Sequence, residues 1–246
     1  MRSSMPDAVS GTARLWLFDI DGTLVAPSED QLDAWVATFR EVFGLELAPA
    51  AIIAHLGQTF AEIVGAVIGA EGQPVPSPRI PEALAAYTRH VRKALAVRTG
   101  QLLPGARELL RFLRARGEMV GVVTGNFAEE GEPKLKGVGL RDLLDVVVYA
   151  NLATPARDAL LRRALAVARA RGFRGDFADT VVVGDSLYDI ASARRTGALA
   201  IAVCTGLTPP DLLVAARPDH LVPDLPSLLV TLRQDGVRWV PSARPD

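Results

Sequence analysis

The stretch Arg14-Leu15-Trp16-Leu17-Phe18-Asp19-Ile20-Asp21-Gly22-Thr23-Leu24 joins an apolar run to two aspartates and a glycine. The run is apolar on both faces, which is typical of a strand in a parallel sheet covered by helices. With Ile20 pointing the other way, both carboxylates can face one cleft, and Gly22 permits a sharp turn. Desolvated carboxylates must be paired or bind metal. The alternative for the pair alone is a turn capped at the surface.

Four further apolar runs, each followed by a turn and a helical pattern, continue this arrangement. They cover residues 119–123, 145–149, 180–183 and 199–203. Helical patterns occur at 105–116, 127–138, 155–171, 187–196, 209–216 and 226–234. The alternation predicts an α/β fold with a doubly wound, mainly parallel, Rossmann-like sheet. Ligands of such sheets bind at the carboxyl ends of the strands.

Residues 26–100 break the alternation. They contain amphipathic patterns around 32–43, 60–70 and 82–97 and no convincing strand, with a proline-rich loop at 72–78. We therefore expect an α/β core made of residues 12–25 and 101–236, interrupted by an all-helical domain at 26–100. The ends of the chain, 1–11 and 237–246, are expected to be loose.

Composition excludes several classes of protein. The 246 residues are 49% hydrophobic and 22% charged, as in globular proteins, and the net charge of -1 gives no electrostatic case for binding nucleic acid. No apolar run is long enough for a membrane span or a secretory signal, and Cys204 is the single cysteine. We expect a cytoplasmic protein, monomeric or homodimeric, with a small molecule as its partner and no contact with nucleic acid or membrane.

Two more strands of the predicted sheet end in polar residues. Thr124-Gly125-Asn126 follows the strand at 119–123, where a hydroxyl and the amides of a helix N-terminus form an anion cradle. Thr124 alone could equally be a helix N-cap. Gly184-Asp185-Ser186 follows the strand at 180–183, and Asp189 begins the next helix, where it could be a cap. Aspartates meeting at one sheet edge suit Mg²⁺, which prefers oxygen ligands and often shares them with substrate phosphate.

These motifs resemble the haloacid dehalogenase (HAD) superfamily. Phe18-Asp19-Ile20-Asp21-Gly22-Thr23-Leu24, the threonine after a hydrophobic strand and the Gly184-Asp185-Ser186…Asp189 motif carry the likeness, and the helical insertion is similar to the cap domain of many HAD phosphatases. The phosphoglycolate phosphatase-like hydrolases are the most similar subgroup. The resemblance implies a HAD-like core and a Mg²⁺-dependent phosphomonoester hydrolase that acts on a small phosphorylated metabolite.

The resemblance also implies a role for each motif residue. Asp19 is expected to attack phosphorus and form an aspartyl-phosphate, while Asp21 acts as general acid and then general base. Thr124 is expected to hold the transferring phosphoryl group. The metal ligands implied are the Asp19 carboxylate, the Asp21 backbone carbonyl and Asp185.

The remaining motif residues support these groups. Gly125 and Asn126 are expected to contact the phosphoryl group beside Thr124. Asp189 is expected to lie next to the metal site as an auxiliary residue, and Gly184 and Ser186 to shape its loop.

One element of the family pattern is absent. Many relatives carry a lysine before the glycine-aspartate motif, at the start of a helix, and the equivalent position here is Thr154. Of the 27 basic residues only three are lysines, so an arginine is a natural replacement. Arg157, one turn further on, is the first candidate because guanidinium binds phosphate in a bidentate way, and Lys134 is the second. The alternative for Arg157 is an ordinary solvated helix residue.

Other activities of the superfamily are weighed in the same way. Asp21 argues against a haloacid dehalogenase, which lacks this second acid. Lys93, late in the last helix of the insertion, is the only lysine there and is poorly placed for a phosphonatase Schiff base. A sugar-phosphate mutase shares all the motifs and stays open. So does a non-catalytic member that binds a ligand on the same scaffold, although the complete set of Asp19, Asp21 and Asp185 argues against it.

Overall fold

Strand β1 (Leu15–Phe18) lies in the middle of a six-stranded parallel sheet of order β3-β2-β1-β4-β5-β6. This computed structural model describes residues 13–72, 79–97, 100–154 and 156–234. The other strands are β2 (Met119–Thr124), β3 (Val146–Tyr149), β4 (Thr180–Gly184), β5 (Leu199–Val203) and β6 (His220–Val222). Phe18 is level with Val122 of β2 and Val183 of β4, so these three strands end at the same edge.

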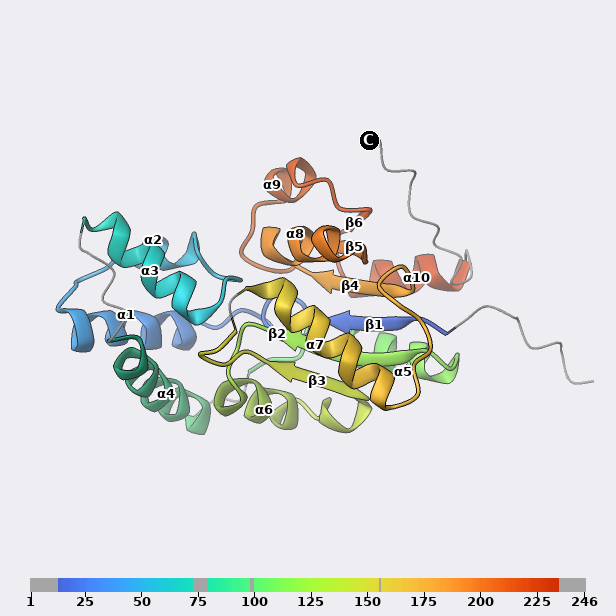
Figure 1. Cartoon of the computed structure of the whole chain (residues 1–246), viewed down its shortest axis with the longest axis horizontal. Helices are drawn as coiled ribbons and strands as arrows, with labels where there is room; N and C mark the ends of the chain where they lie inside the picture. The colour runs from blue at the N-terminus through green and yellow to red at the C-terminus, as the bar shows by residue number, and fades with distance from the viewer. Residues whose placement is uncertain (1–12, 73–78, 98–99, 155, 235–246) are drawn as a thin grey trace, which may run out of the picture.

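Both faces of the sheet are covered by helices, as Figure 1 shows. Trp16 and Phe18 pack in one cluster with α5 (Ala106–Ala115), α6 (Ala128–Gly137) and α10 (Leu225–Gln234). Leu15 and Leu17 point to the opposite face and pack with α7 (Arg157–Ala170), α8 (Leu187–Thr196) and α9 (Pro210–Ala215). The alternation of β1 side chains between two apolar layers explains its uninterrupted apolar sequence. The predicted doubly wound α/β class is confirmed.

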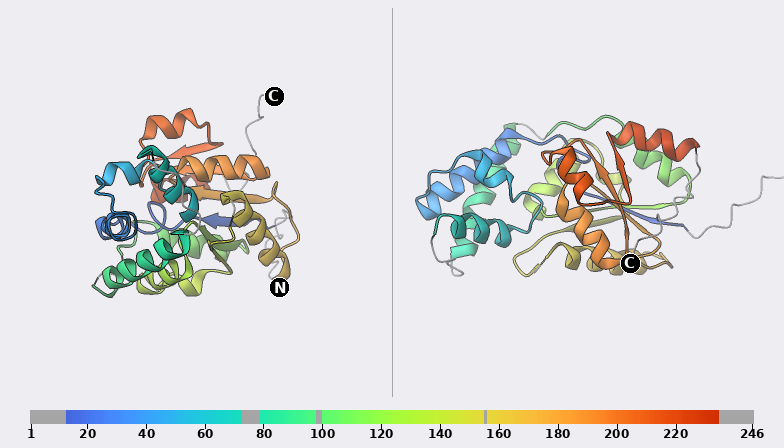
Figure 2. Two further views of the ribbon diagram at one scale, coloured as in Figure 1. Left: turned by 60° about the vertical axis from the view of Figure 1, so that its left-hand side comes forward. Right: turned by 90° about the horizontal axis from the view of Figure 1, so that it is seen from above.

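The insertion after β1 forms helices α1 (Glu29–Phe43), α2 (Pro49–Ile53), α3 (Phe60–Ala70) and α4 (Ile80–Val97). They share a hydrophobic cluster of their own, in which Trp35 stacks on Phe60 with ring centroids 4.9 Å apart. Figures 1 and 2 place this helical group, called the cap below, beyond the carboxyl ends of the strands. The exact domain boundaries at 25/26 and 100/101 stay a prediction.

The structure corrects the sequence-based expectation in two places. A sixth strand, β6, adds to the edge of the sheet beside β5; its three residues are too short to give a pattern, and Pro223 follows at once. The short helix α2 begins at Pro49, a residue suited to the first turn of a helix, and was not predicted. Residues 73–78 of the proline-rich loop predicted at 72–78, and both predicted loose ends, 1–11 and 237–246, fall outside the described residues.

No helix in the described ranges is long and apolar enough to span a membrane.

Candidate active site

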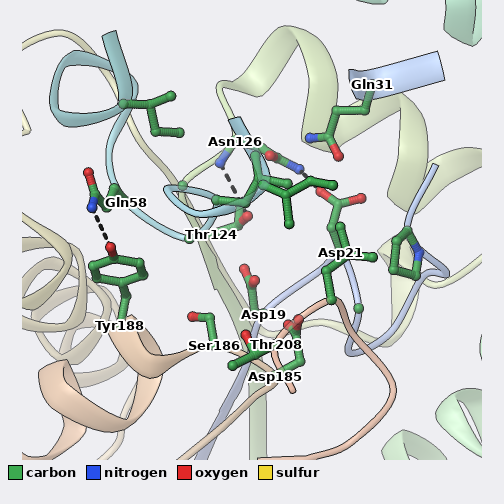
Figure 3. Close-up of a pocket in the computed structure, with 18 of the residues that line it drawn as sticks. Asp19, Asp21, Gln31, Gln58, Thr124, Asn126, Asp185, Ser186, Tyr188 and Thr208 are labelled. Carbon is green, nitrogen blue, oxygen red and sulfur yellow. Dashed lines mark hydrogen bonds between the residues drawn. The ribbon is translucent and has the colours of Figure 1, made fainter. Parts of the chain in front are cut away.

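A cavity of about 210 Å³ lies between the cap and the carboxyl ends of β1, β2 and β4. The residues that follow these three strands reach it together, because β1 is flanked by the other two. Figure 3 shows Asp19, Thr124 and Asp185 around one space, with Gln58 and Tyr188 closing one side. The sequence motifs far apart in the chain therefore meet at a single place.

Asp19 is held at the bottom of this cavity with 7% of its surface exposed. Its backbone N–H donates to the carbonyl of Val183 at 3.0 Å, which fixes the end of β1 against β4. Its Oδ1 atom is buried and has no hydrogen-bond partner among the described residues, with Nη2 of Arg157 3.4 Å away. Burial raises the pKa of Asp19 to about 7; the Arg157 guanidinium opposes this rise, and Asp189 and Asp21 add to it. Burial therefore disfavours the ionised form of Asp19, and a further positive charge nearby would favour it.

Carboxylate oxygens of Asp19, Asp185 and Asp189 lie within 4.8 Å of one another. Asp185 accepts a hydrogen bond from the Thr23 hydroxyl at 3.2 Å, and burial together with Asp189 and Asp19 raises its pKa well above the usual range. Such a cluster of buried acids is unfavourable without a cation. The all-oxygen donor set and the unpartnered Oδ1 of Asp19 fit Mg²⁺.

Asp189 is already engaged by donors of the protein. One of its oxygens pairs with the Arg157 guanidinium, and the other accepts from the backbone N–H of Ser186 at 3.2 Å and its hydroxyl at 2.6 Å. Ser186 is the N-cap of α8, and Asp189 completes a capping box at its third residue. Asp19 and Asp185 are therefore the side chains available to a metal, and Asp189 supports them.

The carboxylate of Asp21 points away from this acidic cluster (Figure 3). Asn126 donates to it at 2.6 Å, and the Lys134 ammonium donates to both of its oxygens at 2.7 and 2.9 Å. Lys134 also donates to Glu130 at 2.6 Å. Burial lowers the pKa of Lys134, but Asp21 and Glu130 raise it more, so this lysine keeps its charge.

The loop after β2 forms the opposite wall. Thr124 is 2% exposed, and its hydroxyl accepts from the backbone N–H of Asn126 at 3.2 Å. A Cβ on Gly125 would lie 3.0 Å from the Gln58 carbonyl oxygen and 3.2 Å from a guanidinium nitrogen of Arg157, so a glycine allows the cap and Arg157 to approach this loop.

Arg157 reaches the same place from the first residue of α7 and is 5% exposed, so the alternative of a solvated surface arginine is wrong. Its guanidinium lies between Asp19 and Asp189. Thr154, the position aligned with the missing lysine, instead closes its own loop, because its hydroxyl accepts from the backbone N–H of Asn151 at 3.1 Å. The structure thus brings Arg157 beside Asp19 and Lys134 beside Asp21.

Sequence reasoning missed a buried polar network that links Lys134 to the cap. Glu130, one helical turn before Lys134, is 2% exposed and accepts hydrogen bonds from Gln31 of α1 at 2.7 Å and from the Tyr87 hydroxyl of α4 at 3.0 Å. Burial raises the pKa of Glu130, against the opposing charge of Lys134. The i,i+4 spacing of Glu130 and Lys134 was the one feature of the sequence that could have indicated this ion pair. No sequence pattern indicated that Gln31 and Tyr87 would bind Glu130.

Glu130→Ala is expected to lower the free energy of unfolding by about 3–5 kcal/mol, because it removes one partner of a buried ion pair and leaves Tyr87 and Gln31 without their acceptor. Denaturant unfolding followed by circular dichroism measures this loss. Glu129→Ala is the matched control, since Glu129 is an exposed residue of the same helix. Equal stability of the two variants would show that the network contributes little.

Comparison with known proteins agrees with this geometry. A model of the haloacid dehalogenase-like hydrolases matches residues 16–203. The chain is 31% identical over 191 residues to a phosphoglycolate phosphatase of Chromobacterium violaceum, covering 77% of this chain and 84% of the relative. It is 37% identical over 135 residues to a phosphoglycolate phosphatase of Synechococcus elongatus, covering 54% of this chain and 60% of the relative.

The fold has solved counterparts as well. A hydrolase from Pseudomonas syringae superposes with a TM-score of 0.78 at 20% identity, covering 90% of this chain and 99% of that one. The predicted resemblance and the predicted enzyme class, a phosphatase of this superfamily, are confirmed by the relatives. The chain belongs to the haloacid dehalogenase-like hydrolases.

Proposed function

We propose that this protein is a Mg²⁺-dependent phosphomonoester hydrolase that works through an aspartyl-phosphate on Asp19. The observation that carries the proposal is the Asp19 carboxylate, which lines the cavity at the end of the central strand beside Asp185 and Arg157. A carboxylate that lines the cavity is placed to attack a phosphate bound there. The phosphatases among its relatives support the same reaction class.

Mg²⁺ held by the carboxylates of Asp19 and Asp185 and the backbone carbonyl of Asp21 would supply positive charge that keeps Asp19 ionised and neutralises the substrate phosphate. The guanidinium of Arg157, held by Asp189, adds a second positive charge on the same carboxylate. Thr124, with Gly125 and Asn126, holds the equatorial phosphoryl oxygens.

In the first step, the Asp19 carboxylate attacks phosphorus while the bond from phosphorus to the ester oxygen breaks, and Asp21 gives its proton to the departing alkoxide. In the second step, Asp21 takes a proton from water as that water attacks phosphorus, and the bond to Asp19 breaks to release phosphate. Lys134 and Asn126 fix the Asp21 carboxylate for both transfers. Cap residues line the cavity and reduce the access of water, so water competes less well with Asp19 for the phosphorus in the first step.

Asp19→Asn is expected to lower turnover of p-nitrophenyl phosphate by about 10³-fold or more, because an amide does not form the phospho-enzyme. Initial rates with Mg²⁺ and with EDTA measure both the loss and the dependence on metal. Asp33→Asn, an exposed residue of α1, is the matched control. Turnover in EDTA equal to that in Mg²⁺, or an active Asp19→Asn variant, would contradict the proposal.

Arg157→Ala is expected to reduce kcat/KM by about 10²-fold, while Arg157→Lys, which keeps the charge, recovers part of it. Lys134→Ala is expected to reduce kcat more than it raises KM, because Lys134 contacts Asp21. Arg162→Ala, exposed on the same helix as Arg157, is the control. Thermal unfolding separates loss of fold from loss of chemistry, and unchanged turnover in both alanine variants would exclude these two cations.

The raised pKa of Asp19 has a consequence for stability. Between its ordinary value of 3.8 and its folded value of about 7, the folded state binds more proton than the unfolded state, so raising the pH destabilises the metal-free wild type. Asn does not titrate. Asp19→Asn in EDTA is therefore expected to unfold at a higher temperature than wild type, with a larger gain near about pH 8 than near about pH 5.

Calorimetry at both pH values measures this difference, and excess Mg²⁺ is the second arm. Mg²⁺ is expected to raise the unfolding temperature of the wild type more than that of Asp19→Asn, because a charged carboxylate binds Mg²⁺ more strongly than a neutral amide does. An equal gain at the two pH values would mean that Asp19 is ionised without metal.

A further inference from the structure

Beyond its acidic end, the cavity is walled by apolar side chains. Both halves of the protein contribute: Trp35, Ile53, Leu56, Phe60 and Ile63 from the cap, and Phe127, Leu207, Pro209 and Leu212 from the core. Leu207 and Leu212 are 42% and 46% exposed, although large apolar side chains are usually covered. Exposed apolar side chains that gather around a concave site mark a surface for an apolar ligand.

The charged side chains that the structure describes around the cavity suit the phosphate group of a substrate and leave no cation for its leaving group. Arg157 is the one basic side chain among the described residues that line it, and it is bound to Asp189 and Asp19. Four carboxylates, those of Asp19, Asp21, Glu130 and Asp185, line the same cavity. A negatively charged leaving group would therefore meet acids and an apolar wall, with no cation left to pair it.

Three arginines of the cap are paired with acids outside the cavity. Arg40 pairs with Glu46, Arg79 with Glu82, and Arg89 with Glu41. All three arginines are exposed and none of them lines the cavity.

The polar side chains of the cap end of the cavity already have partners in the protein. The Tyr87 hydroxyl and the Gln31 amide donate to Glu130, and the Gln58 amide donates to the Tyr188 hydroxyl (Figure 3). A sugar hydroxyl that accepts from the Tyr87 hydroxyl or from the bonded amide N–H of Gln31 would have to compete with Glu130 for that donor. The apolar side chains of the cavity are better matched to a leaving group that forms no hydrogen bonds.

We propose that the substrate's leaving group is uncharged and apolar, an alkyl or aryl alcohol of about the size of one aromatic ring. The inference rests on the proposed phosphatase function and narrows it. The cavity of about 210 Å³ is smaller than the sites of drug-sized ligands, roughly 300 Å³ and above, so a small ester fits. A carboxylate in the leaving group, as in phosphoglycolate, is disfavoured because it would be buried against Glu130 and apolar carbon without a partner.

The test compares substrates that differ by one charge. 4-Methylbenzyl phosphate and 4-carboxybenzyl phosphate share the ring and the leaving oxygen, and propyl phosphate and phosphoglycolate form a smaller pair. With Mg²⁺ we expect kcat/KM to be higher for the uncharged member of each pair by about tenfold or more. The rate of phosphate release measures the hydrolysis of all four esters. Equal or faster hydrolysis of the carboxylates would overturn this inference and leave the phosphatase proposal standing, whereas no hydrolysis of any of the four esters would overturn both.

A charge placed in the apolar wall gives a second readout. Leu212→Arg adds a cation at an exposed residue of α9 beside the cavity, and Leu212→Gln is a control of similar length without charge. The arginine is expected to raise the ratio of kcat/KM for 4-carboxybenzyl phosphate to that for 4-methylbenzyl phosphate by about fivefold or more, and the glutamine is not. The same ratio in both variants would show that the leaving group does not approach this wall.

Discussion

The carboxylate of Asp19, held away from water at the end of the central strand, is the group on which the rest of the site depends. An ionised carboxylate there is costly, and its surroundings compensate for this cost. Because β1 lies between β2 and β4, the flanking strands bring Thr124 and Asp185 to it directly. Helix α7 begins where the Arg157 guanidinium can reach it. The strand order of the sheet therefore determines which side chains surround the Asp19 carboxylate.

The two aspartates of the first motif are two residues apart and lie in different electrostatic surroundings. Asp19 faces Asp185, Asp189 and the single guanidinium of Arg157. Asp21 faces the ammonium of Lys134 and the amide of Asn126. Each of the two carboxylates therefore has a buried cation of its own, Arg157 beside Asp19 and Lys134 beside Asp21.

Much of this arrangement could be predicted from sequence, because it depends on local pattern. The strand ending in Asp19, the parallel class and the helical insertion follow from periodicity and from glycine and proline positions. Arg157 and Lys134 could be chosen as candidates because only three lysines compete, but their division between Asp19 and Asp21 depends on where α6 and α7 start relative to β1. Glu130 could not be found, since its partners Tyr87 and Gln31 are brought to it by packing of the cap. Strand β6 was missed because three residues carry no period.

Phe127 is the N-cap residue of α6 in the core, yet its side chain belongs to the hydrophobic cluster of the cap, where it meets Phe60 edge-on with ring centroids 5.6 Å apart. Moving the cap away would expose this ring to water at a cost of about 1.5–3 kcal/mol, before any loss of the hydrogen bonds to Glu130 is counted. Any movement that separates the cap from the core must therefore break this aromatic contact together with the hydrogen bonds from Gln31 and Tyr87 to Glu130.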